Sequence, residues 1–240
     1  MASSKPPLIF IHGFRGNHLG LEAIADYFTD YQVFIPDLPP AGKQQLPAYT
    51  AHSYANWMAD YIKGYHIKKP ILIGHSMGSI IAAATATHYP DLVGDKLILL
   101  SPISVKTPRL FAALTPLSAL LPNKIISYLT TKYLIGQKGK KKFRNILGTT
   151  YVCGADFTTK KEVYQTAKFS VSHAIKDFKL RQRTLFIIGE QDRVVSKKKS
   201  VQTANQLGAE ITILKNTGHL HNYEAPKSTA TAIREFLEKA

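Results

Sequence analysis

Cysteine is almost absent from this sequence: Cys153 is the single example in 240 residues. An internal disulfide is therefore excluded, and with it the disulfide framework that holds small secreted domains together. Cys153 has no base near it in the sequence, so we interpret it as a small packing residue. The histidines His12, His18, His219 and His221 lack any familiar metal-ligand spacing, and we expect neither a metal site nor another cofactor.

Long apolar runs are also missing. No run reaches the length that is needed to span a bilayer. The apolar stretch at residues 8–11 is too short for the central region of a signal peptide, and no small-residue cleavage site follows it. Together with the single cysteine, these absences predict a cytoplasmic protein. The length fits one large α/β domain that carries an insertion.

Acidic residues are scarce, with 16 Asp and Glu against 31 Lys and Arg, which gives a formal net charge of +15. Residues 102–183 hold 16 of the basic residues and three of the acidic ones, a net charge of +13. These lysines are either solvated or attract an anionic membrane surface or an acidic substrate. No nucleic-acid-binding motif accompanies the charge, so no nucleic acid partner is expected.

Short apolar segments alternate with segments of helical periodicity on both sides of this basic region. The pattern predicts strands over residues 8–11, 31–35, 71–73, 96–100, 184–188 and 210–214. It predicts helices over residues 19–28, 53–65 (with Ser53 as the cap), about 77–88, 196–207 and 225–237. Because each strand is apolar throughout, we expect a mostly parallel sheet that helices cover on both faces.

The alternation is interrupted in the middle of the chain. Residues 102–183 predict helices over 110–121, 125–135 and 160–178 but no comparable strand. We therefore predict a core domain formed by residues 1–101 and 184–240, with residues 102–183 inserted as a helical cap.

One stretch carries a chemical motif. Gly74-His75-Ser76-Met77-Gly78 has the form G-x-S-x-G and lies between a predicted strand and a predicted helix. In that setting the serine sits in a sharp turn, where the glycines allow the strand and helix to approach closely. Ser76 is therefore the candidate nucleophile. The alternative is that Ser76 only caps the helix.

A candidate acid and a candidate base follow later strands. Asp192 follows the strand at 184–188, and His219 follows the strand at 210–214. Residues that follow parallel strands gather at one edge of the sheet. His219 would take the proton of the serine, and Asp192 would orient and stabilise the histidine. Glu190 and His221 are the rivals for these two roles.

An oxyanion needs two donors beside the serine. The backbone N–H of Met77, at the start of the helix, and that of Phe14, in the loop after the first strand, are the candidates. Their side chains are expected to matter less than their backbones. His12 is interpreted as a structural hydrogen-bonding residue, and His75 as a packing residue.

These motifs together resemble those of the α/β-hydrolase fold serine hydrolases, in the subgroup of capped esterases and lipases. The matching residues are His12-Gly13-Phe14, Asp37-Leu38-Pro39, Gly74-His75-Ser76-Met77-Gly78, Gly189-Glu190-Gln191-Asp192 and Gly218-His219. Pro40-Ala41-Gly42 and Ser79 depart from the pattern. Some relatives carry the acid before the cap, where this chain has Ser101-Pro102.

The resemblance implies a sheet of about six strands, because the first two antiparallel strands of the family have no counterpart here. It also implies that the cap selects the substrate, and Leu110, Phe111 and Leu114 are then expected to bind it. The implied reaction is hydrolysis of a carboxylic ester with a small to medium apolar acyl group. An acyl thioesterase, a carbon–carbon bond hydrolase and a ligand-binding receptor or adaptor on the same fold are the alternatives. A halide-displacing enzyme is disfavoured, because its nucleophile would be an aspartate.

Overall fold

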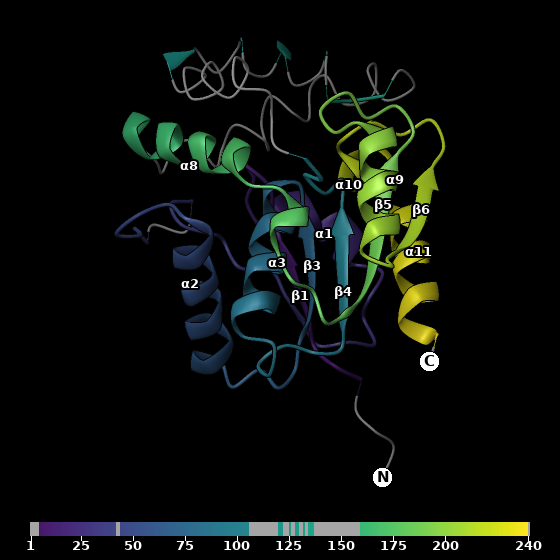
Figure 1. Ribbon diagram of the computed structural model, residues 1–240, viewed down its shortest axis with the longest axis horizontal. Helices are drawn as coiled ribbons and strands as arrows, with labels where there is room; N and C mark the ends of the chain where they lie inside the picture. Colours follow the sequence, from purple (N-terminus) through teal and green to yellow (C-terminus); the bar gives the residue numbers. More distant parts are fainter. Residues whose placement is uncertain are drawn as a thin grey trace.

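A six-stranded, all-parallel sheet forms the centre of the molecule (Figure 1). The computed structural model describes residues 5–41, 44–105, 120–121, 125, 128–129, 132, 134–136 and 159–239. The strands are β1 (Leu8–Ile11), β2 (Val33–Phe34), β3 (Ile71–His75), β4 (Lys96–Leu100), β5 (Arg183–Gly189) and β6 (Glu210–Leu214), in the order β2-β1-β3-β4-β5-β6. The predicted sheet of about six mostly parallel strands is confirmed.

The register of the central strands brings their carboxyl ends to one edge of the sheet. Ile11 pairs with Gly74, and His75 pairs with Leu100. β1 and β3 are buried along their whole length, as the apolar sequences predict. The residues that follow β1, β3, β4, β5 and β6 therefore meet above this edge, where open parallel sheets bind their ligands.

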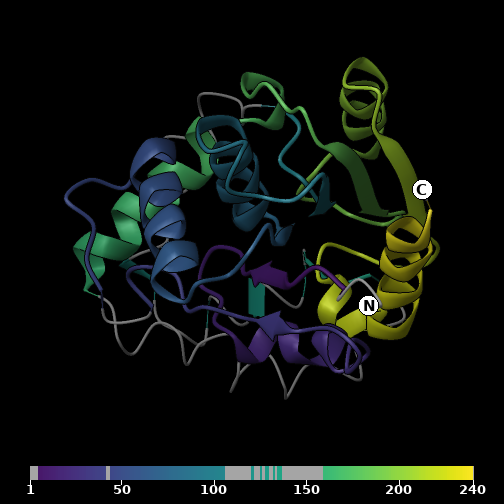
Figure 2. The ribbon, with the colours of Figure 1, turned by 90° about the horizontal axis from the view of Figure 1, so that it is seen from below.

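Helices cover both faces of the sheet. α1 (Leu19–Ala25) and α11 (Pro226–Glu238) pack on one face, and α2 (Ala51–Gly64), α3 (Met77–His88) and α9 (Lys197–Gln206) pack on the other. Figure 2 shows purple α1 and yellow α11 on one side of the strands, with blue α2 and teal α3 opposite. Within the described part of the chain, no helix is long and apolar enough to cross a bilayer.

The described part of the predicted cap includes α8 (Lys160–Ser172), which lies above the carboxyl ends of the strands (Figure 1). Thr159 and Glu162 form a capping box that starts this helix. The helix predicted at 125–135 is described only at some positions, of which Ile125, Tyr128, Leu129 and Lys132 are helical. Leu110, Phe111, Leu114 and Cys153 lie outside the described residues.

Several predicted boundaries were wrong. α1 ends at Ala25 instead of 28, and β3 extends to His75 instead of ending at 73. β2 has two residues instead of five, because only Val33 and Phe34 pair with β1. α2 begins earlier than predicted, since the Thr50 hydroxyl, and not that of Ser53, accepts the N–H of residue 53 at 3.1 Å. α8 ends at Ser172 instead of continuing to 178, because His173 and Ala174 are extended and a short 3₁₀ helix follows at Ile175–Asp177.

Candidate active site

Ser76 lies in the sharp turn between β3 and α3. Its backbone has φ 52° and ψ −116°, a left-handed conformation that a serine adopts at a cost of about 1–3 kcal/mol. A Cβ atom at Gly74 would clash with the backbone of Gly78, and one at Gly78 would clash with the carbonyl of Ile11. The two glycines therefore let β3, α3 and β1 come close enough to hold Ser76 at the edge of the sheet.

A chain of hydrogen bonds joins Ser76, His219 and Asp192. Ser76 Oγ lies 2.9 Å from His219 Nε2, and His219 Nδ1 lies 2.8 Å from Asp192 Oδ2. The side chains of His219 and Asp192 are 3% and 0% exposed, whereas Ser76 is partly exposed. The rival acid Glu190 is exposed and accepts the N–H of Asn216 instead, at 3.1 Å.

Asp192 is saturated with donors. Its Oδ1 accepts the N–H groups of Val194 and Val195 at 2.8 and 2.9 Å, and its Oδ2 accepts His219 and the hydroxyl of Ser101, the latter at 2.6 Å. Burial alone would raise the pKa of Asp192, but His219 and these donors outweigh it and hold the pKa well below its usual range. The carboxylate is therefore ionised and only accepts.

Ser101 and His221 form a second serine–histidine pair, in which Ser101 binds the carboxylate of Asp192. Ser101 follows β4, and its Oγ lies 2.9 Å from Nε2 of His221. Because the Ser101 hydroxyl donates its proton to Asp192, His221 Nε2 must carry the hydrogen that the Ser101 oxygen accepts. This histidine cannot then serve as a base toward Ser101. Both residues are fully buried, in contrast to Ser76.

Two further histidines fix the surrounding loops. His75 Nε2 lies 2.9 Å from the carbonyl of His219 and so donates to it, which joins the Ser76 turn to the histidine loop. His12 Nε2 accepts the N–H of Leu38 at 2.9 Å and holds the loop after β2. Burial lowers the pKa of His75 to about 3 and also lowers that of His12. Both act as neutral hydrogen-bonding groups, a role that the sequence predicts for His12, whereas it predicts only packing for His75.

The loop after β1 passes directly beside Ser76. A Cβ atom at Gly13 would lie 3.2 Å from Ser76 Cβ. Phe14 occupies the turn that Gly16 closes by donating to the Gly13 carbonyl at 3.1 Å. Met77 opens α3, so its N–H belongs to the first turn, whose donors have no acceptor within the helix. Both candidate oxyanion donors therefore come from backbone next to Ser76.

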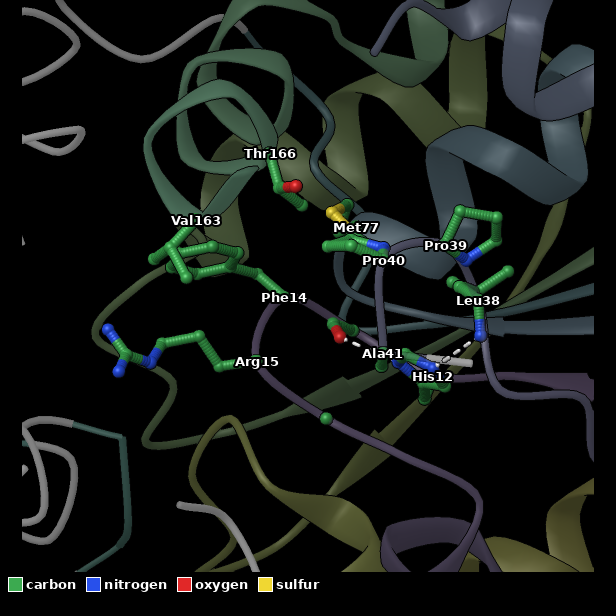
Figure 3. Close-up of a pocket in the computed structure, with 12 residues that line it drawn as sticks. His12, Phe14, Arg15, Leu38, Pro39, Pro40, Ala41, Met77, Val163 and Thr166 are labelled. Atoms are coloured by element: carbon green, nitrogen blue, oxygen red, sulfur yellow. Dashed lines mark hydrogen bonds between the residues drawn. The ribbon is translucent and has the colours of Figure 1, made fainter. Parts of the chain in front are cut away.

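A pocket lies beside these two residues. Figure 3 shows the Phe14, Met77 and Val163 side chains gathered around it, while the Arg15 guanidinium points away. Its walls are largely apolar and come from the loops after β1 and β2, the start of α3, and α8. The lining residues include Phe14, Leu38, Pro40, Met77, Val163 and Thr166. Within the described residues, no cluster of His, Cys, Asp or Glu side chains is suited to a metal ion.

A profile of the alpha/beta hydrolase family matches residues 8–232. The chain belongs to this family. An esterase from Thermogutta terrifontis has a TM-score of 0.82 at 20% identity, over 98% of this chain and 90% of its own.

Two curated relatives match a smaller part of the chain. Mb2734, an uncharacterised protein of Mycobacterium bovis, is 36% identical over 107 residues. The rat protein named 1-acylglycerol-3-phosphate O-acyltransferase ABHD5 is 37% identical over 108 residues. Each match covers 42% of this chain and 30% of the relative's length.

Some residues around the site of this alpha/beta hydrolase were not identified from the sequence. From the sequence, Ser101 indicates only that the alternative position of the acid holds no acidic residue. His221 is there only a rival of His219 for the role of the base. Val163 belongs to the predicted cap, but its apolar character does not distinguish a pocket residue from a core residue. The side chains of Phe14 and Met77, expected to matter little, line the pocket.

Proposed function

We propose that this protein is a serine hydrolase that cleaves a carboxylic ester through an acyl-enzyme intermediate on Ser76. One observation carries the proposal: Ser76 Oγ lies 2.9 Å from the acceptor nitrogen of a histidine whose other nitrogen is bound to an ionised carboxylate. This arrangement activates a hydroxyl for attack on an acyl carbon. Ser76 is partly exposed whereas Ser101 is buried, which favours Ser76 as the nucleophile.

In the first half of the reaction, the Ser76 proton moves to His219 Nε2 as Ser76 Oγ bonds to the acyl carbon. The carbonyl oxygen becomes an oxyanion, and we assign its binding to the backbone N–H groups of Phe14 and Met77. The carbon–oxygen bond to the alcohol then breaks, and His219 returns the proton to the departing alcohol. Water repeats the sequence with the same base, which releases the acid and restores Ser76.

We infer the acyl group of the substrate from the residues that line the pocket. Because the oxyanion donors Phe14 and Met77 also line it, a bound acyl carbon at Ser76 directs its chain into this space. The apolar walls favour a small to medium hydrocarbon acyl group. Leu110, Phe111 and Leu114 stay predictions as additional substrate-binding residues.

The test compares hydrolysis of p-nitrophenyl acyl esters of increasing chain length by wild type, Ser76→Ala and Ser101→Ala. We expect Ser76→Ala to lose at least about 10³-fold in kcat. Ser101→Ala should lose about 10-fold or less, since Asp192 keeps three of its four donors. Loss of activity in Ser101→Ala alone would assign the nucleophile to Ser101. Equal rates for wild type and both variants would contradict esterase activity.

Acyl thioesters and tight ligand retention without turnover are the alternatives to be tested in parallel. The basic insertion supports an acidic acyl carrier as the source of a thioester. Faster hydrolysis of acyl thioesters than of the matched oxygen esters would replace the esterase proposal with a thioesterase. Retention of an unaltered ligand by wild type and Ser76→Ala alike would favour a receptor.

A second proposal concerns the surface of the cap. Leu120, Ile125 and Tyr128 are large apolar side chains that are 65%, 44% and 61% exposed, within a region of net charge +13. Apolar groups among many cations suit an anionic membrane, because lipid head groups attract the cations while acyl chains accept the apolar groups. We propose that the cap brings the hydrolase to such a surface.

A further inference from the structure

A short segment of the insertion, residues 134–136, lies directly against the loop that carries His219. The N–H of His219 donates to the carbonyl of Leu134 at 2.7 Å. Ile135 and Leu220 pack together and are each 1% exposed. This segment therefore supplies part of the immediate support of the histidine.

The two backbones touch at glycines. A Cβ atom at Gly218 would lie 2.5 Å from the Gly136 nitrogen and 2.6 Å from the Leu134 oxygen. No other residue type fits there without a shift of backbone, so the contact between the insertion and the histidine loop is built into the sequence of both segments.

Glu224, the last residue of α10 (His221–Glu224), bridges these segments with its carboxylate. Oε2 accepts the N–H groups of Gly136 at 2.7 Å and Gly218 at 2.9 Å, and Oε1 accepts that of Leu220 at 3.3 Å. Three backbone donors from two distant segments thus converge on one partly buried carboxylate. Burial raises the pKa of Glu224, against the effect of these donors.

Every polar group of His219 is consequently held. Its ring is bound by Ser76 and Asp192, its carbonyl accepts from His75, and its N–H donates to Leu134. The N–H groups of the two neighbouring residues, Gly218 and Leu220, donate to the Glu224 carboxylate. A change in the position of residues 134–136 or of Glu224 must therefore move the histidine relative to Ser76.

We propose that Glu224 is a positioning residue for His219, and that its bond to Gly136 makes the placement of this histidine depend on the docked segment 134–136 of the cap. The inference rests on the proposed hydrolase function. It gives the cap a role in assembling the catalytic residues, in addition to enclosing the substrate.

Glu224→Gln tests the role, because the amide keeps the size of the side chain but replaces an acceptor oxygen with a donor nitrogen. Glu190→Gln is the matched control: Glu190 also accepts a backbone N–H near this loop, from Asn216, but does not bind residues 218–220 or 136. Titration with a serine-reactive phosphonate counts the active sites, so that kcat is expressed per competent molecule.

We expect Glu224→Gln to lower kcat per titrated site by about 10-fold or more, because small misplacements of a catalytic group are costly. KM should change by less than about two-fold, since Glu224 does not line the pocket. Glu190→Gln should match wild type in both. A Glu224→Gln enzyme with wild-type kcat per titrated site would overturn the positioning role and leave a stability role only.

Hydrogen–deuterium exchange provides a readout that needs no substrate. Glu224→Gln should accelerate exchange in the peptides that contain residues 134–136 and 218–220, whereas Glu190→Gln should leave both unchanged. Unchanged exchange in the first peptide would overturn the link to the cap. If wild type hydrolyses no ester, the proposed function fails, and the exchange data still decide whether Glu224 joins the two segments.

Discussion

At the scale of single residues, three buried histidines form hydrogen bonds in the folded protein but lower its stability at low pH. Burial lowers the pKa of His75 to about 3 and that of His221 to about 4, and it also lowers that of His12. His75 and His12 join loops around Ser76, and His221 donates to Ser101. Each ring must stay neutral in the folded protein, whereas the unfolded chain binds protons freely at these positions.

We predict that stability falls steeply between pH 6.5 and pH 4. In this window the unfolded chain binds more protons than the folded protein, so the free energy of unfolding decreases as the pH falls. Each of these histidines contributes up to about 1–2 kcal/mol between pH 7 and pH 5. The amide of His221→Gln still donates to Ser101. This variant should lose stability less steeply than wild type, as measured by urea unfolding at pH 7 and pH 5.

His88→Gln is the control for this comparison, because His88 is exposed at the end of α3. It should keep the pH dependence of wild type. If His221→Gln and His88→Gln show the same slope as wild type between pH 7 and pH 5, the buried His221 does not carry the effect.

At the scale of elements, the turn at Ser76 depends on how closely β1, β3 and α3 pack. Gly78 lies in α3, where a Cβ atom would clash with the Ile11 carbonyl. We predict that Gly78→Ala destabilises the protein by about 3 kcal/mol or more, because backbone would have to move on both elements. Gly64→Ala is the matched change: it lies in α2 with open space around it, and should be neutral or stabilise by about 0.5–1 kcal/mol.

Urea unfolding of the two alanine variants measures this difference. A loss for Gly78→Ala no larger than the change for Gly64→Ala would show that the elements do not approach as closely as described. Since the same packing holds Ser76, the destabilised variant should also lose activity per folded molecule, whereas Gly64→Ala should not.

α8 supplies one wall of the pocket beside Ser76 through Val163, and we propose that this pocket holds the acyl group. We predict that Val163→Ala raises kcat/KM for longer acyl esters relative to shorter ones by about 10-fold, because the added space accepts further methylenes. Tyr164→Ala, on the exposed face of the same helix, should leave the chain-length profile unchanged. A shared shift in both variants would mean that helix stability, and not the pocket wall, sets the profile.

The sequence predicted what local patterns determine. A few neighbouring residues are enough to identify each apolar strand and the turn at Ser76. The six strands of the sheet and the order of Ser76, Asp192 and His219 could therefore be predicted. The bond from Ser101 to Asp192 joins residues 91 positions apart, and its geometry depends on how β4 and β5 align. The contact of Leu134 with His219 likewise requires the folded path of the insertion. Such pairings leave no periodic signal in the chain.

At the scale of the whole molecule, the charge distribution determines which surfaces attract the protein. The net charge is +15, and residues 102–183 contribute +13 of it. A single-sign field of this size attracts anionic surfaces over a distance of about 10 Å at 0.1 M salt. α8 lies above the carboxyl ends of the strands (Figure 1), and its Lys160, Lys161 and Lys168 are exposed.

We predict salt-sensitive binding to vesicles that contain anionic lipid and little binding to vesicles of neutral lipid alone. Each lysine near a charged surface contributes about 1 kcal/mol, so replacing Lys160, Lys161 and Lys168 of α8 by Glu should weaken binding at least about 100-fold. The same change at Lys197, Lys198 and Lys199 of α9 alters the net charge equally and is the control. Equal binding to anionic and neutral vesicles would contradict membrane docking, and equal losses for both triple variants would assign the attraction to net charge instead of to the cap.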